Sequence, residues 1–165
     1  MKLFLTTITL FCTVLFSAKP SLKEIRSHYA TAVKDATVAQ ELYTSLTEVS
    51  TEDTPILYAY KGGVSAIMAK HVKGLKNKKD HFKEGATLIE KAIADSPDNI
   101  EIRCIRLGVQ ENSPKLLKYK GNIDEDKAFV LKHYTNEKSA AVKAVIQDFV
   151  LQSSLFSDEE KAKFK

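Results

Sequence analysis

Apolar residues recur at helical spacing along almost the whole chain, and this pattern constrains the fold more than any other feature. Leu22, Ile25 and Tyr29 follow one another at intervals of three and four residues, so they share one face of a helix. The same spacing continues in three further stripes: Val38, Leu42, Leu46 and Val49; Phe82, Ala86, Ile89 and Ile93; Val142, Val145, Phe149 and Val150. A helix of this length is marginal alone in water, so each stripe predicts a partner helix.

The composition points to the same fold class. Only 6 glycines and 4 prolines occur in 165 residues, too few for a β-sandwich or barrel with a turn signal every few residues. Hydrophobic residues make up 44% of the chain, which is enough to bury a core. We therefore predict an all-α protein of antiparallel helical hairpins, with a single domain over residues 19–165.

Chemical signals mark where the helices begin and end. Capping boxes, in which a hydroxyl and a carboxylate three residues apart satisfy free amide donors, fit Ser21–Glu24 and Ser157–Glu160. Looser N-caps stand at Asp98 and Asn122, and prolines open helices at Pro55 and Pro114. Stops are predicted at Lys73–Gly74, Ser96–Pro97 and Lys120–Gly121. The predicted helices cover residues 21–35, 37–49, 55–72, 78–95, 98–111, 114–120, 123–134, 138–152 and 157–163.

Two segments allow more than one interpretation. Ile100–Cys104 alternates as a strand would, but no second strand is available to pair with it, so a helix is predicted. Gly62 and Gly63 are adjacent within the predicted helix 55–72, where they cost about 1–2 kcal/mol relative to alanine. Either a neighbouring helix packs closely there, or the helix breaks.

Residues 1–18 have the layout of a secretory signal peptide. Lys2 supplies a basic start, residues 3–16 carry no charge, and Ser17 and Ala18 are small. The apolar stretch falls short of the ~20 residues that a membrane-spanning helix requires, so a permanent anchor is the weaker interpretation. We expect cleavage near Ala18 and export across the inner membrane of a bacterium, to the periplasm or beyond.

The exported part would carry a mild positive charge and one cysteine. The chain has 25 basic and 21 acidic side chains, and loss of residues 1–18 removes only Lys2 from this balance. That excess is too small to indicate a dedicated polyanion binder. Cys12 would leave with the signal peptide, so Cys104 could form no intramolecular disulfide, and we expect it to be a small buried apolar residue.

The stretch from Leu88 to Leu107 resembles the junction between two tetratricopeptide repeats. Ile89, Ala92 and Pro97 stand where that family has an aromatic residue, an alanine and a proline, and Asp98–Asn99 opens the next helix. The resemblance implies a short right-handed array of helical hairpins, without implying a particular function. The whole chain is also similar to uncharacterised secreted proteins of Gram-negative bacteria.

The chain departs from the repeat family in three respects. A long lysine-rich loop is predicted between helices 55–72 and 78–95, and it breaks the 34-residue period. Gly85 stands where the family has its second small residue. Helix 98–111 lacks the family's large aromatic residue.

Lysines form the densest charge feature. The cluster comprises Lys70, Lys73, Lys76, Lys78, Lys79 and Lys83. Four of them, Lys73, Lys76, Lys78 and Lys79, are candidates for contact with anionic lipid or cell-wall polymer. The alternative is a solvated loop that binds nothing. The cluster contains no arginine and no free aromatic residue, so we expect no nucleic-acid partner.

No sequence motif indicates a metal, a cofactor or a reaction. The four histidines have no histidine partner three or four residues away, and no zinc or EF-hand pattern occurs. Asp124, Glu125 and Asp126 are explained by the positive end of the dipole of helix 123–134. Catalytic serine, phosphate-loop and Cys-x-x-Cys motifs do not occur, so we expect no metal, no cofactor and no enzymatic activity, although a spatially assembled triad stays open.

Arg103, Arg106 and Gln110 are the remaining polar group of interest. Their spacing places them on one helix face, where they could line the concave side of a helical array and clamp a carboxylate or backbone carbonyls of a bound segment. The alternative is internal bonding, for example to Glu90 or Asp95.

Taken together, these features predict an exported, non-catalytic protein that binds a protein or peptide of the cell envelope. Arg103, Arg106 and Gln110 are the predicted contact face. The alternative function is docking of the lysine cluster on anionic lipid or cell-wall polymer, and a small hydrolase is the third. No transmembrane segment is predicted beyond residue 18, and the sequence does not predict the oligomeric state.

Overall fold

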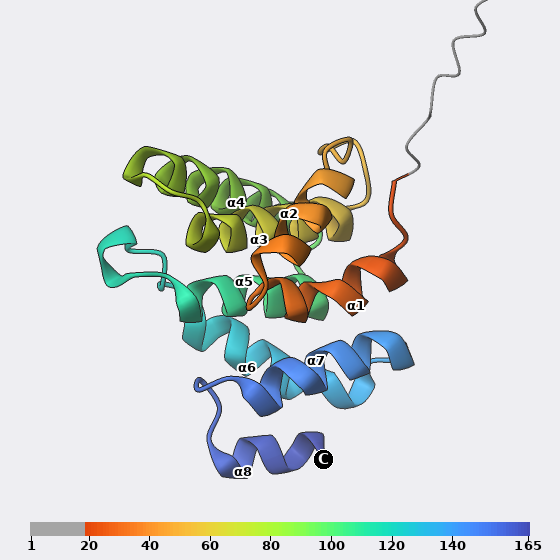
Figure 1. The fold of residues 1–165 in the computed structure, drawn as a ribbon. Helices are drawn as coiled ribbons and strands as arrows, with labels where there is room; N and C mark the ends of the chain where they lie inside the picture. The colour runs from red at the N-terminus through yellow and green to blue at the C-terminus, as the bar shows by residue number, and fades with distance from the viewer. Residues whose placement is uncertain (1–18) are drawn as a thin grey trace, which may run out of the picture.

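The computed structural model describes residues 19–165, and over this range the protein is all-α. The signal-peptide prediction for residues 1–18 lies outside the described residues. Eight α-helices and three short 3-10 turns make up the described chain, and it contains no strand (Figure 1). The helices are α1 Leu22–Ala32, α2 Ala36–Ser45, α3 Pro55–His71, α4 Leu75–Asp95, α5 Ile100–Asn112, α6 Ile123–His133, α7 Ala140–Gln152 and α8 Asp158–Lys161. The 3-10 turns are Lys115–Leu117, Tyr134–Asn136 and Ala162–Phe164.

Most predicted helix ends are confirmed by the structure. Both capping boxes form, with Ser21 and Ser157 each accepting a hydrogen bond from the amide three residues later. Pro55 occupies the first position of α3. The N-cap of α5 is Asn99, one residue after the predicted Asp98, and the Asn99 side chain accepts from the amides of Glu101 and Ile102. The segment from Ile100 is helical, as predicted.

Two predicted elements are wrong. Helix α4 begins at Leu75 and the connection to α3 is only residues 72–74, so the lysine cluster lies mainly on a helix and not in a long loop. Gly74, at φ 85°, lets the chain reverse in this short turn, and lysine is a good helix former. The predicted helix 114–120 is only the 3-10 turn Lys115–Leu117, because Lys118 takes a left-handed conformation that ends it.

Close packing of α3 and α4 explains the paired glycines. Helix α3 runs without a break through Gly62 and Gly63. A Cβ atom on Gly62 would lie 2.7 Å from the carbonyl oxygen of Gly85 in α4, and a Cβ on Gly63 would collide with the Tyr29 ring of α1. Both glycines therefore permit helix contacts that any side chain would prevent. The close-packing interpretation is confirmed, and Gly85 supplies the other half of the contact.

Helix α5 is the centre of the molecule. Ten of its 13 residues are buried, and it separates two hydrophobic cores. Ile102, Ile105 and Val109 face the larger core, built with α1 to α4. Cys104 and Leu107 face the smaller core, built with α6, α7 and the C-terminal residues. The two cores correspond to the upper and lower parts of the ribbon (Figure 1).

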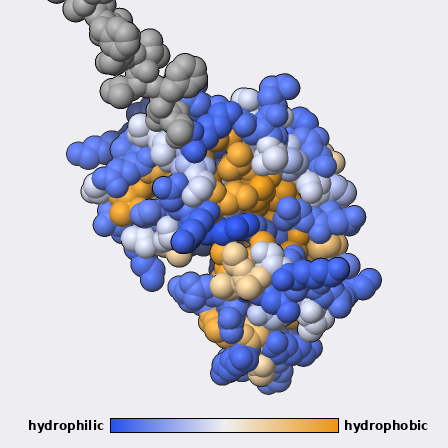
Figure 2. All heavy atoms as spheres, turned by 90° about the vertical axis from the view of Figure 1, so that its right-hand side faces the viewer, coloured by the Kyte–Doolittle hydropathy of each residue, from blue (hydrophilic) through white to orange (hydrophobic). Residues whose placement is uncertain are grey.

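The helices pack in a regular order. Helix α1 contacts α2 and α3, α3 contacts α4 and α5, and α5 contacts α6 and α7. Helices α3 and α5 therefore contact both their chain neighbours, and each odd-numbered helix from α1 to α7 contacts the next odd-numbered one. Seen from the right-hand side of Figure 1, hydrophobic atoms reach the surface where the upper and lower parts meet (Figure 2).

Candidate functional site

A groove of about 1170 Å³ lies among the described residues, and the four helices α1, α3, α5 and α7 line it together. The start of α4 and the segment after α5 complete its walls. Its lining includes the apolar side chains Tyr29, Ile67, Ile105, Val109 and Phe149. Known small-molecule pockets commonly range from about 300 to 1,000 Å³, so this groove exceeds a typical pocket for one small ligand.

Gly108 lies on the α5 side of the groove, and the packing of the described residues does not require a glycine there. A Cβ at this position would meet only Phe149, at an ordinary contact distance of 3.5 Å. Its φ is not positive, in contrast to that of Gly74. A glycine in a helix interior costs about 1 kcal/mol relative to alanine. Its effect here is to leave the α5 backbone open to whatever enters the groove.

Four lysines lie together on one wall of the groove. Lys34, Lys70, Lys78 and Lys79 lie on the wall formed by α1, α3 and α4. Their side chains are exposed, and none of them forms an ion pair within residues 19–165. The end of α1 and the end of α3 meet because His71 Nε2 lies 3.2 Å from the Ala32 carbonyl oxygen. This places one basic wall beside the apolar lining.

The four lysines selected from the sequence divide into two groups. Lys78 and Lys79 line the groove, whereas Lys73 and Lys76 do not. Lys76 forms an exposed ion pair with Asp80 at 2.6 Å, and this contact lowers the pKa of the Asp80 carboxyl. Two of the four therefore belong to the groove wall, and the other two lie outside it.

The predicted contact face of Arg103, Arg106 and Gln110 is buried. Their exposed fractions are 7%, 3% and 0%, so this face is not open to a partner. Arg106 donates to Glu90 and, through Nε and Nη2, to both oxygens of Asp126. The alternative of internal bonding is therefore the one observed, with Glu90 as predicted. Asp95 instead binds Tyr58 and Lys91.

Asp126 was not predicted to be buried, because the sequence explained it by the helix dipole alone. It is fully buried, and its carboxylate accepts from Arg103 at 2.7 Å and from Arg106 at 2.6 and 2.7 Å. The helix dipole does not account for such a position. The sequence does contain a pattern that indicates this burial. One helix face carries Ile123, Asp126 and Val130, so the carboxylate lies within an apolar stripe.

The rest of this ion-pair cluster closes around the two arginines. Arg103 also reaches the Glu125 carboxylate at 2.9 Å, which lowers the pKa of Glu125, and its guanidinium lies 4.2 Å from the centre of the Phe129 ring. The Gln110 side-chain amide, one turn beyond Arg106, has no hydrogen-bond partner within the described residues. The cluster joins α5 to α4 and α6, so its function is structural.

A second buried carboxylate lies near the N-terminal end of α5. Glu101 accepts both guanidinium contacts of Arg26 at 2.7 Å and the Tyr60 hydroxyl at 2.6 Å. All three residues line the groove, and they join α5 to α1 and α3. Burial, together with the charge of Glu101, raises the pKa of Tyr60. Hydrogen bonds from Arg26 and Tyr60 therefore occupy both carboxylate oxygens of Glu101.

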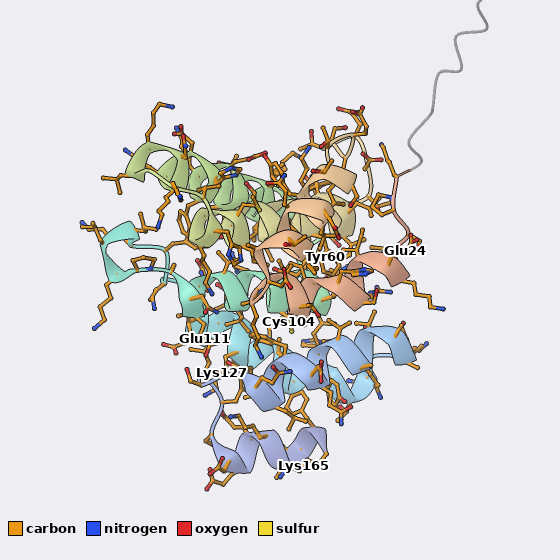
Figure 3. The ribbon with its side chains drawn as sticks, in the orientation of Figure 1. Glu24, Tyr60, Cys104, Glu111, Lys127 and Lys165 are labelled. Atoms are coloured by element: carbon orange, nitrogen blue, oxygen red, sulfur yellow. The ribbon has the colours of Figure 1, made fainter. Side chains whose placement is uncertain are left out.

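Cys104 is buried in the smaller core, near the middle of the molecule (Figure 3). Burial, together with the charges of Glu101 and Asp126, raises the pKa of its thiol. The thiolate is the reactive form of cysteine, so the folded protein keeps this side chain inert. This is the buried apolar role that the sequence predicted.

Ser65, His81 and Glu84 form a serine–histidine–carboxylate group on the contact between α3 and α4. The Ser65 hydroxyl lies 2.7 Å from Glu84 Oε2, 3.0 Å from the His81 carbonyl oxygen and 3.3 Å from His81 Nδ1, and that ring nitrogen is 3.9 Å from Glu84 Oε2. In a catalytic triad the histidine stands between the serine and the carboxylate. Here serine contacts the carboxylate directly and is fully buried, so the group links two helices.

Within residues 19–165, no three histidine, cysteine or carboxylate side chains converge in a way that could hold a metal ion. Over the same range, no helix combines the length and the apolar character needed to cross a bilayer.

No protein-family model matches the chain, and comparisons with curated proteins and with solved structures found no match either.

Proposed function

We propose that this is an exported, non-catalytic binding protein, whose groove holds an apolar segment of a protein or peptide of the cell envelope. In this proposal the helices form a short right-handed array of hairpins similar to tetratricopeptide repeats. The observation that carries the proposal is the lining of one groove by α1, α3, α5 and α7.

The helix order supports a hairpin array. The four lining helices begin at Leu22, Pro55, Ile100 and Ala140, which are 33, 45 and 40 residues apart. In arrays of stacked helical units, equivalent helices form an extended concave surface used for binding. The first interval is close to the repeat length of about 34 residues in the tetratricopeptide family, and the longer α4 accounts for part of the larger second one.

The shape and charge of the groove support a peptide as its occupant. The groove is larger than most small-molecule pockets, has an apolar lining and leaves the α5 backbone open at Gly108. An amphipathic segment can lay its apolar residues along such a surface. The unpaired lysines Lys34, Lys70, Lys78 and Lys79 would favour an acidic residue next to that apolar segment.

Internal pairing supports a non-catalytic role. The groove contains Glu101, Tyr60 and Cys104, which are types of residue that enzymes use. The Tyr60 hydroxyl donates a hydrogen bond to Glu101. The raised pKa of the Cys104 thiol keeps it protonated. Reactive groups in enzymes have pKa values matched to their task, which is not the case for this thiol.

The proposal is tested by selecting, from a random peptide library, the peptides that bind the full-length protein. Enriched peptides would be resynthesised, and their affinity measured by fluorescence anisotropy for wild type and Gly108→Leu. Leucine would fill the groove at α5, so we expect at least about tenfold weaker binding. Ala30→Trp, at an exposed position on the α1 wall, should weaken binding in the same way.

Gly121→Leu is the matched control, because Gly121 lies outside the groove with no atom within 4 Å of its Cβ position. It should bind as wild type does. Equal affinity of all variants, or no enriched peptide, would contradict the groove as the binding site. Export is tested separately: mass spectrometry of protein recovered from the periplasm should give Lys19 as the first residue, and recovery only of uncleaved cytoplasmic protein would refute it.

A further inference from the structure

Three large hydrophobic side chains are exposed on the described protein, and all three line the groove. Leu75 is 85% exposed, Leu116 is 89% exposed and Leu117 is 38% exposed. Leu75 opens α4, whereas Leu116 and Leu117 belong to the 3-10 turn between α5 and α6. Both segments project at the left-hand edge of the molecule in Figure 1. The exposed leucines therefore mark one end of the protein.

The two leucine-bearing segments are held against each other. The ring of Tyr119 packs edge-on against Phe82 of α4 with 5.6 Å between ring centres. Its hydroxyl also donates to Glu90 of α4 at 2.6 Å. Lys118, at φ 51°, turns the chain back so that Tyr119 can reach α4. The leucines are thus presented together on a fixed support.

Lysines surround these leucines in the sequence. Around Leu75 stand Lys73, Lys76, Lys78 and Lys79, with Asp80 as the one acid between residues 72 and 80. Around Leu116 stand Lys115, Lys118 and Lys120, and residues 113–121 contain no acid. Protruding apolar side chains within a basic surface are typical of proteins that lie on anionic membranes.

We propose that this end of the protein, formed by residues 73–79 and 115–120, docks on an anionic phospholipid surface, with Leu75 and Leu116 inserted among the headgroups. The lysines supply charge complementarity to the lipid phosphates, and the leucines supply apolar contact. A second copy of this chain does not fit, because the same face on both copies is basic and would repel. The docking end shares Leu75, Leu116, Lys78 and Lys79 with the lining of the groove, so the two proposals are told apart by their probes, a lipid vesicle here and a selected peptide there.

The chain has no tryptophan, so one introduced tryptophan reports on its own surroundings alone. The full chain with Leu116→Trp would be mixed with vesicles of phosphatidylglycerol and phosphatidylcholine. We expect its emission to move to shorter wavelength and to be quenched by bromine-labelled lipid. Ala141→Trp is the matched control, because Ala141 is exposed at the start of α7, at the opposite end of the molecule, and its emission should not change. Residues 1–18 are present in both variants, so they cannot cause a difference in emission between the two.

Charge and apolar contact are separated by two further sets of variants in the Leu116→Trp chain. Each lysine near an anionic surface contributes about fivefold to partitioning, so Lys115→Gln and Lys118→Gln should each weaken it by about that factor. Leu75→Gln should weaken it by about tenfold. Lys138→Gln, away from this end, should have no effect.

Several outcomes would overturn the proposal. The first is an unchanged emission of the Leu116→Trp chain with anionic vesicles, and the second is an equal shift with pure phosphatidylcholine. A shift that Ala141→Trp shares would show insertion unrelated to this end. An emission shift that grows with protein concentration in the absence of vesicles would indicate self-association. An emission shift that appears only when a peptide selected on the groove is added would show that the leucines bind the peptide and not lipid.

Discussion

A Cβ atom placed on Gly85 in α4 would lie 2.5 Å from the carbonyl oxygen of Gly62 in α3 and 2.8 Å from the amide nitrogen of Ala66. The two helices therefore touch backbone to backbone at this point. This contact fixes the direction in which α4 crosses α3, and with it the position of the basic wall of the groove.

Replacing Gly85 by alanine should destabilise the protein by about 2 kcal/mol, because backbone atoms cannot move aside as a flexible side chain can. Urea unfolding followed by circular dichroism measures the change. Gly108→Ala is the control, since the added methyl group has ordinary room at 3.5 Å from Phe149. That variant should gain up to about 1 kcal/mol from helix propensity. Equal effects of the two substitutions would contradict the close contact.

Asp126→Asn should lower the free energy of unfolding by about 3–5 kcal/mol, because it leaves the charges of Arg103 and Arg106 buried with less compensation. Asp124→Asn changes the same charge at an exposed position two residues earlier, and should alter stability by less than about 0.5 kcal/mol. Thermal and urea unfolding of both variants test this. A similar small effect for both would show that the buried ion pairs do not stabilise the fold.

Stability should fall in alkaline solution as the tyrosines ionise. Burial, with a hydrogen bond to Asp95, raises the pKa of Tyr58 to about 12, and burial also raises the pKa of Tyr29, Tyr60 and Tyr119. The unfolded chain releases these protons near pH 10, whereas the folded protein retains them. The unfolded state then binds fewer protons, so the contribution present below pH 10 is lost as the pH rises toward 12 and above. Tyrosinate absorbance should appear together with loss of helical circular dichroism. Full tyrosine ionisation with the helices intact would contradict this.

Cys104 should resist thiol reagents until the protein unfolds. The test uses the Cys12→Ser chain, in which Cys104 is the remaining cysteine. In native buffer we expect slow reaction with a disulfide reagent, because the thiol is buried and its pKa is raised. In denaturant one thiol should react at once. Rapid reaction under native conditions would show that the centre of α5 opens readily.

The helices and most of their ends were predictable because their causes are local. A capping box such as Ser21–Glu24 lies within four residues, and an apolar stripe within two or three turns. Errors arose where local signals were weak. The dense lysines after Gly74 suggested a loop, although lysine favours a helix and α4 already begins at Leu75. Pro114 does not open an α-helix, because Lys118 takes a left-handed conformation four residues later.

The amino-acid pattern alone was enough to establish that this protein is built from amphipathic helices, and to raise close packing as one explanation of Gly62 and Gly63. It was not enough to establish which polar residues are buried. Arg103 and Arg106 share a face with helical spacing, but it is the packing of α6 on α5 that brings Asp126, 23 and 20 residues further along the chain, against them. The groove likewise depends on four helices that are far apart in the sequence. Helix formation depends on neighbours within a turn or two, whereas burial and pairing depend on which helix faces meet when the chain packs.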